Sequence, residues 1–310
     1  MMNRVSTAGN YQSALLNLMA AQNQQFEAQT RLSTQKVATD MEGFGRGAES
    51  LTALKASQNR VQGFIDTGTA VADRLESQDL ALNQIGDAVI GARANIAGAL
   101  ATENINTLML ELNGQFQSIQ NGLNAEHQGS YMFAGSNTST APVTVSSMAE
   151  LAAAPSVVST FTNDSLPPTS RLGEATTVRT GYLADDIGTT IFQIFRDIQA
   201  YSNDPLTGPL TGKPNAAQKT FLTAQLSRLD GASASTIDVT SRNGSLAKQV
   251  DSTNDSHKAQ VAQLGEMVSA KTDADLARAV TDIQLAQIAV QASAQVISQL
   301  KDTSLLNYLR

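Results

Sequence analysis

The fold is decided by residues 273–310, DADLARAVTDIQLAQIAVQASAQVISQLKDTSLLNYLR, at the end of the sequence. Large apolar residues recur there every seven positions, at Leu276, Ile283, Val290 and Ile297. Smaller or equally apolar residues fill the neighbouring positions, at Val280, Ala286, Ala289, Ala294 and Leu300. This spacing predicts one long helix with a continuous apolar seam along which it packs.

The same helix avoids charge. No Asp, Glu, Lys or Arg occurs between Ile283 and Leu300, a length that could suggest a membrane span. Glutamines at steps of three and four mark one side of the helix: Gln284, Gln287, Gln291, Gln295 and Gln299. Five amides in a bilayer would each need a partner, so we expect no membrane insertion. A surface without charge instead predicts that nearly all of this helix contacts other protein.

The beginning of the chain shares this property. Residues 11–36 have a helical pattern of apolar residues, and Val5–Phe26 contains no charged residue. The simplest interpretation is that the two terminal helices pack side by side. Two ordinary core helices are the alternative. The glycine-rich residues 40–47 predict a loop or short turn after the first helix.

A longer helix follows. Between Leu54 and Ala99, 11 of 14 positions in a seven-residue frame are apolar, which is typical of a coiled-coil-like helix. The frame is offset afterwards, and a second apolar series runs from Ile105 to Leu123. We therefore predict a kink or break near residues 101–104, with Thr102 as a candidate cap.

The middle of the chain has a different composition. Ser, Thr, Gly and Pro are frequent after Gly129, and short β-branched runs at residues 143–145, 157–161 and 176–179 predict short strands. Asp185 or Asp186 could cap a helix that buries one face, at Ile187, Ile191, Ile194, Phe195 and Ile198.

These patterns predict a mainly α fold: an elongated bundle of long coiled-coil-like helices from both chain ends, with a small β-rich domain inserted in the middle. Five segments are expected. Residues 1–38 and 271–310 are the terminal helices, 39–130 and 216–270 are the two halves of a long-helix rod, and 131–215 is the insertion.

Composition excludes several functions. The net charge of -7 disfavours nucleic acid as a partner. The absence of Cys removes disulfides, zinc thiolates and thiol catalysis. His127 and His257 lie far apart in sequence, without metal-ligand spacing around either. We expect no catalytic residues, no cofactor and no metal. Met1–Thr7 lacks the apolar core of a cleavable signal peptide, so we expect any export to use another route.

Two carboxylate pairs are candidate sites. Asp185 with Asp186 and Asp273 with Asp275 could serve acid–base chemistry or calcium. Helix capping explains both pairs more simply, because carboxylates near a helix N-terminus accept hydrogen bonds from its free N–H groups.

Several strings resemble the bacterial flagellin family. The runs from Lys271 to Val280 and from Leu285 to Ser293 are similar to the family's terminal helix, and Arg4–Thr7 and Leu32–Lys36 to its N-terminal region. The ending Ser304–Leu309 and the string YMFAGS at residues 131–136 are more similar to the hook-associated branch, whose members join hook to filament. The resemblance covers residues 1–136 and 216–310. Residues 39–46 depart from the family pattern.

The resemblance implies a structural subunit of the flagellum. Family members pack their terminal helices in the core of a hollow tube and leave the cell without a cleaved signal peptide, held by an export chaperone near the C-terminus. The implied partners are the hook-side junction protein, flagellin and copies of the chain, and the implied location is extracellular.

For subunit or bundle packing we select seven residues: Leu15, Leu18, Phe26, Leu276, Ile283, Val290 and Ile297. The alternatives are a flagellin subunit of the filament itself, a cytosolic coiled-coil scaffold, and an enzyme hosted in the β insertion.

Overall fold

The computed structural model describes residues 2–306, and the side chains of residues 9–300. The chain divides into two compact units. The terminal unit comprises Met1–Arg60 and Gln260–Arg310, and the central unit comprises Val61–Ala259. Two of the helices, α2 (Ala48–Ala101) and α6 (Ala216–Thr272), contribute to both units.

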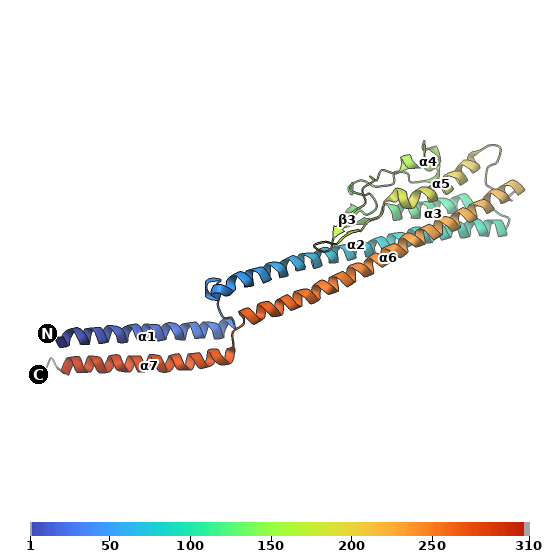
Figure 1. Ribbon diagram of the computed structural model, residues 1–310. Coiled ribbons are helices and arrows are strands. Elements are labelled where there is room, and N and C mark those ends of the chain that lie inside the picture. Colours follow the sequence, from blue (N-terminus) through green and yellow to red (C-terminus); the bar gives the residue numbers. More distant parts are fainter. Residues whose placement is uncertain (1, 307–310) are drawn as a thin grey trace. The chain divides into compact units, whose positions relative to one another are not determined.

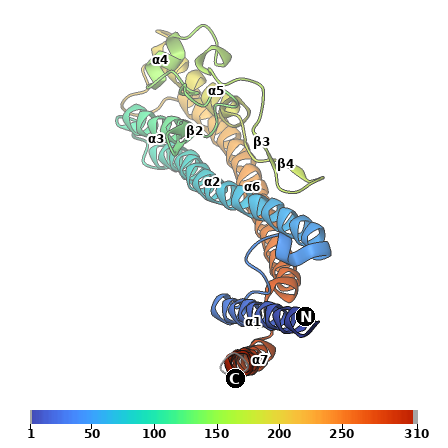
Figure 2. The ribbon, with the colours of Figure 1, turned by 90° about the vertical axis from the view of Figure 1, so that its left-hand side faces the viewer.

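In the terminal unit, α1 (Met2–Thr34) and α7 (Leu276–Leu306) run antiparallel beside each other (Figure 1 and Figure 2). A short backbone bridge joins their ends. The N–H of Val37 donates to the carbonyl of Thr272 at 2.8 Å, and the N–H of Ala274 donates to the carbonyl of Gln35 at 2.9 Å. The prediction that the two terminal helices pack side by side is therefore confirmed. We call α1 and α7 together the terminal helix pair.

The turn predicted for residues 40–47 is a short 3₁₀ helix, Glu42–Gly47. It is kinked at Gly45, whose φ of 50° lies in the left-handed region that favours glycine.

In the central unit, α2 and α6 lie antiparallel (Figure 1). The amide of Asn243 on α6 donates to the carbonyl of Leu75 on α2 at 2.9 Å, and Arg93 of α2 forms an ion pair with Asp230 of α6. The predicted seven-residue frame is the buried side of α2, where Leu75, Leu82, Val89 and Ile96 are fully enclosed. The coiled-coil prediction for α2 is confirmed in this unit.

The predicted break is also present. Helix α2 ends at Ala101 and α3 (Leu108–Leu123) begins after a short bend, which the N–H of Ile105 fastens by donating to the carbonyl of Gly212 at 2.9 Å. Thr102 does not cap α3, so that prediction was wrong. Its hydroxyl donates back to the carbonyl of Gly98 at 2.9 Å, because Thr102 still lies over the last turn of α2.

The insertion contains two antiparallel strand pairs, β1 (Glu126–His127) with β2 (Ser130–Tyr131) and β3 (Thr169–Arg171) with β4 (Thr177–Arg179). It also contains the short helix α4 (Met148–Ala153). The strand predicted at residues 157–161 was wrong in part. Val158–Thr160 forms a 3₁₀ turn, because the Ser159 and Thr160 hydroxyls bond to nearby backbone carbonyls. The observed fold class is the predicted one, mainly α with a small β insert.

Helix α5 (Ala184–Asn203) closes the core of the central unit. Its predicted apolar face is buried, and the ring of Phe116 on α3 lies 4.9 Å from that of Phe192 and 5.7 Å from that of Phe195. Gly122 of α3 lies against Ile85 and the carbonyl of Ala81 on α2, so these two helices approach closely.

Candidate assembly surface on the terminal helices

The interface inside the terminal helix pair is made by alanine. Ala14, Ala21 and Ala28 recur every seven residues on α1 and are 3–8% exposed, and Ala279 and Ala286 on α7 are 3% and 5% exposed. Helices with small side chains at their contact can approach closely, since the interaxial distance depends on those side chains. The large apolar residues of both helices then lie at the edges of the interface or outside it.

On α1, four large apolar side chains form an exposed stripe. Tyr11, Leu15, Met19 and Phe26 follow one another at steps of four, four and seven residues, which places them on one side of a helix. Phe26 is 71% exposed. Such a stripe of aliphatic and aromatic side chains is unusual on a surface that remains in water.

Helix α7 has exposed apolar residues on two sides. Leu276 and Val280 lie beside the alanine interface, and Leu285, Ile288 and Val296 lie farther round the helix. Leu285 and Ile288 are 60% and 63% exposed. Exposed apolar groups therefore lie on several sides of the pair. We call the exposed apolar residues of α1 and α7 the assembly surface.

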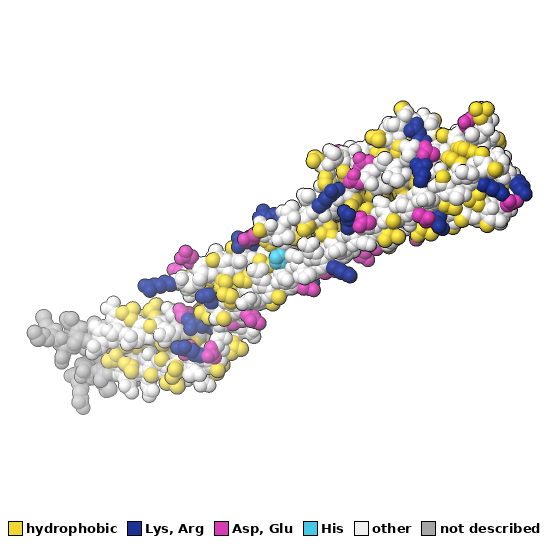
Figure 3. Space-filling model, turned by 45° about the vertical axis from the view of Figure 1, so that its right-hand side comes forward, with side chains coloured by type: hydrophobic (Ala, Val, Ile, Leu, Met, Phe, Trp, Pro, Cys, Tyr) yellow, Lys and Arg dark blue, Asp and Glu magenta, His cyan; other side chains and the backbone are white. Residues whose placement is uncertain are grey.

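Among the side chains that the structure describes, charge on the pair is confined to the end where the helices are joined. Glu27 and Arg31 form an ion pair at 3.7 Å, and Lys36 pairs with Asp273. The hydrogen bonds that Asp273 accepts from Lys36 and Ser269 lower its carboxyl pKa to about 2. On the face in Figure 3, yellow and white atoms cover most of the described part of the pair, and charged side chains gather at that end.

The seven residues selected from the sequence fall into two groups. Leu18, Ile283, Val290 and Ile297 are half-buried, whereas Leu15, Phe26 and Leu276 are exposed. Their role in packing between subunits stays a prediction. The alanines were not predicted as the buried contact, and Leu285, Ile288 and Val296 were not predicted as exposed residues. The seven-residue repeat of Ala14, Ala21 and Ala28 was the signal that could have identified the interface.

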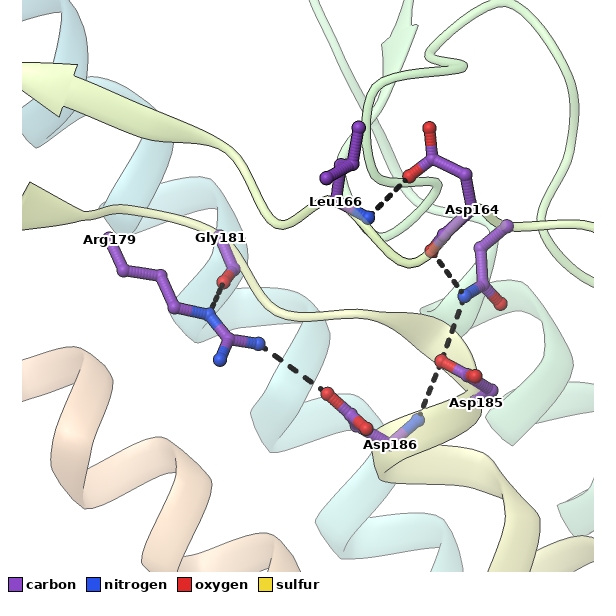
Figure 4. Close-up of polar contacts among 7 residues, drawn as sticks. Asp164, Leu166, Arg179, Gly181, Asp185 and Asp186 are labelled. Carbon is purple, nitrogen blue, oxygen red and sulfur yellow. Dashed lines mark hydrogen bonds and ion pairs between the residues drawn. The ribbon is translucent and has the colours of Figure 1, made fainter.

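The carboxylate pairs have structural partners. Asp275 accepts a hydrogen bond from the N–H of Arg278 at 3.0 Å and so caps α7, as expected. Near α5, Asp185 accepts from the N–H of Asp186 at 2.9 Å and from the amide of Asn163 at 2.8 Å (Figure 4). Helix α5 begins one residue before Asp185, at Ala184, so these carboxylates lie in its first turn rather than at its N-cap.

The same close-up shows what this turn holds in place. Arg179 contacts the carboxylate of Asp186 at 3.5 Å and donates to the carbonyl of Gly181, while Asp164 accepts from the N–H of Leu166 (Figure 4). These contacts fasten loops of the insertion to α5.

Among the side chains of residues 9–300, no cluster of three or more His, Asp or Glu could hold a metal ion. No helix in the described part of the chain has the length and hydrophobicity needed to cross a membrane.

Comparisons with known proteins agree with this architecture. Residues 226–309 match the family model of the bacterial flagellin C-terminal helical region. A comparison with curated protein sequences gave no match.

Two solved structures share the fold. One is a protein of Vibrio parahaemolyticus described as a flagellar hook-associated protein, with a TM-score of 0.59 and 15% identity over 75% of this chain and 99% of that one. The other is FlgL of Bacillus cereus, with a TM-score of 0.54 and 13% identity over 71% of this chain and 98% of that one. The chain thus has the fold of these flagellar proteins, and its residues 226–309 match the flagellin C-terminal helical region.

Proposed function

We propose that this chain is a structural subunit of the bacterial flagellum that joins the hook to the filament. The observation that carries the proposal is the assembly surface, a charge-free apolar surface on helices whose C-terminal member matches the flagellin model. The likeness to a hook-associated protein and to FlgL favours the junction over the filament.

The assembly surface supplies the mechanism. Each large apolar side chain that becomes fully buried contributes about 1.5–3 kcal/mol. Several such side chains per subunit offset the loss of translational and rotational freedom on association. The role is mechanical, and no step of it requires catalysis or a cofactor.

The segments take corresponding roles in this proposal. Residues 1–38 and 271–310 form the assembly core, 39–130 and 216–270 form the long-helix rod, and 131–215 form an outward-facing insertion. The partners are the hook-side junction protein, flagellin, other copies of the chain and an export chaperone that binds near the C-terminus. The protein acts outside the cell and is exported without a cleaved signal peptide.

The first test is electron microscopy of cells lacking the gene, together with an assay for flagellin in the medium. We expect hooks without filaments and flagellin shed as monomer. Shortened filaments without shed flagellin would make the chain a filament subunit. Unchanged flagella would reject a flagellar role and favour a cytosolic scaffold.

In the second test, variants of the chain are expressed in the cells that lack the gene. Phe26→Ser and Ile288→Ser remove exposed apolar side chains of the assembly surface, so filaments should be lost although the purified chain keeps its helix content. Leu206→Ser is the matched control, because Leu206 is 94% exposed in the central unit. Normal filaments with both helix variants would show that the assembly surface is not required for assembly.

A further inference from the structure

The central unit contains a pocket that the proposed assembly role does not use. It has a volume of about 260 Å³ and lies where α2 meets the β1–β2 hairpin. Its polar lining includes Arg74 of α2, His127, Ser130 and Tyr131 of the hairpin, and Thr138 of the segment that follows.

The hairpin wall is fixed by its backbone. Gln128 and Gly129 both have positive φ, 51° and 76°, as a two-residue turn between antiparallel strands requires. The N–H of Tyr131 donates to the carbonyl of Thr138 at 2.9 Å, which holds the next segment against the hairpin. The polar side chains of the pocket are therefore carried on ordered backbone.

Arg74 is a charge without a counter-ion. Its guanidinium donates to the carbonyl of Met132 at 3.2 Å, and no carboxylate in the described part of the chain pairs with it. The side chain is half-buried, and desolvation lowers the pKa of Arg74. A guanidinium nevertheless stays charged at neutral pH, and its remaining donors suit an oxyanion.

His127 is held in one orientation. The hydroxyl of Ser77 donates to the carbonyl of Asp73 at 3.0 Å, and its oxygen lies 2.8 Å from Nδ1 of His127, which donates to it in the Nδ1–H tautomer. In the neutral ring Nε2 then carries a lone pair and can accept a hydrogen bond from a ligand. The hydroxyls of Ser130 and Thr138 have no hydrogen-bond partner among the described residues and can donate.

A ligand that matches this set carries negative oxygen for Arg74 and a hydroxyl for the His127 ring. Hydrogen phosphate has both, whereas sulfate has no hydroxyl at neutral pH. We propose that the pocket binds inorganic hydrogen phosphate, with Arg74 as its charge partner and His127 as the residue that selects phosphate over sulfate.

One carboxylate opposes this binding. Glu126 lies in β1 and accepts a hydrogen bond from the Tyr131 hydroxyl, which raises the pKa of Tyr131. The proton of Tyr131 is therefore committed to Glu126, and the nearby negative charge weakens the attraction of an anion. Removing that charge gives a variant whose effect has the opposite sign to the loss of Arg74.

Titration calorimetry on the full chain at neutral pH and constant ionic strength tests the proposal. Sodium phosphate should bind. Sodium sulfate should bind at least tenfold more weakly, because it lacks the one hydrogen bond to His127, and the loss of one hydrogen bond is on the order of a tenfold change in affinity. Arg74→Gln should weaken phosphate binding roughly tenfold or more, Arg74→Lys should weaken it less, and Glu126→Gln should strengthen it. Circular dichroism on each variant shows whether it folds.

The remaining variant addresses selectivity. His127→Leu should bring phosphate binding down to the level of sulfate. Glycerol 3-phosphate is the ester control. Its phosphate has mostly lost its hydroxyl proton at neutral pH, so it should bind more weakly than inorganic phosphate, and tighter binding would contradict the role of His127. Equal binding of phosphate and sulfate to the wild-type chain, or unchanged phosphate binding by folded Arg74→Gln, would overturn the proposal.

Discussion

At the scale of single residues, Glu103 connects two distant parts of the central unit. It lies in the bend after α2 and pairs with Lys219 and, at 2.6 Å, with Lys213, both of which are more than a hundred positions away in the sequence. Hydrogen bonds from the two lysines lower the pKa of Glu103 from 4.5 to about 2. The carboxylate thus favours the folded state only while it is ionised.

The pH dependence of unfolding follows from this pair of pKa values. Because the folded pKa lies below the unfolded one, the contribution of Glu103 is complete above pH 4.5 and is lost as the pH falls towards 2. In urea unfolding, the free energy of unfolding should therefore fall less between pH 4.5 and 2 for Glu103→Gln than for the wild-type chain. The control is Glu76→Gln, which removes a carboxylate without an ion pair among the described residues. An equal dependence of the unfolding free energy on pH for the wild-type chain and Glu103→Gln would contradict the role of Glu103 and its two lysines.

At the scale of elements, the packing of α3 on α2 depends on a glycine. A Cβ added to Gly122 would lie 2.6 Å from Cγ1 of Ile85 and 3.2 Å from the carbonyl oxygen of Ala81. The backbone oxygen cannot move without displacing α2. Gly114 of the same helix is exposed and has no atom within 4 Å of such a Cβ.

These two glycines should respond to alanine in opposite directions. Gly122→Ala should destabilise the central unit by about 1–3 kcal/mol through overpacking. Gly114→Ala should stabilise it by roughly 0.5–1 kcal/mol, because alanine is the better helix former. The free energy of unfolding of both variants is measured by chemical denaturation. A gain in stability from Gly122→Ala would show that α2 and α3 separate easily.

At the scale of the whole molecule, the two units differ in the side chains that form their buried contacts. The central unit has a core of aliphatic and phenylalanine side chains from α2, α3, α5 and α6. In the terminal helix pair the buried contact is alanine, and larger apolar groups remain exposed. We therefore expect the terminal helices to depend on each other, and on neighbouring subunits in an assembly, more than the central unit does.

Removal of residues 276–310 tests this dependence. Without α7, α1 loses its alanine contact, and an isolated helix is marginal in water. Hydrogen exchange in residues 2–34 should become fast, while protection in residues 61–259 should be unchanged. The intact chain is the reference. Persistent protection of α1 in the shortened chain would mean that its stability does not come from α7.

The sequence determined the helices, the break between α2 and α3, and the charge-free stretches 5–26 and 283–300, because these features appear as spacing and composition along a single helix. The polar residue Asn243 of α6 is explained only by the tertiary structure, because it is buried and its amide donates to the carbonyl of Leu75 on α2. Only the tertiary structure decided which apolar residues face inward. The large residues Leu15 and Phe26 are the more hydrophobic choice, yet Ala14 and Ala21 are buried, because two antiparallel helices approach most closely where side chains are small. The pocket beside Arg74 likewise required the fold, since it brings together α2 and a hairpin more than fifty residues away in the sequence.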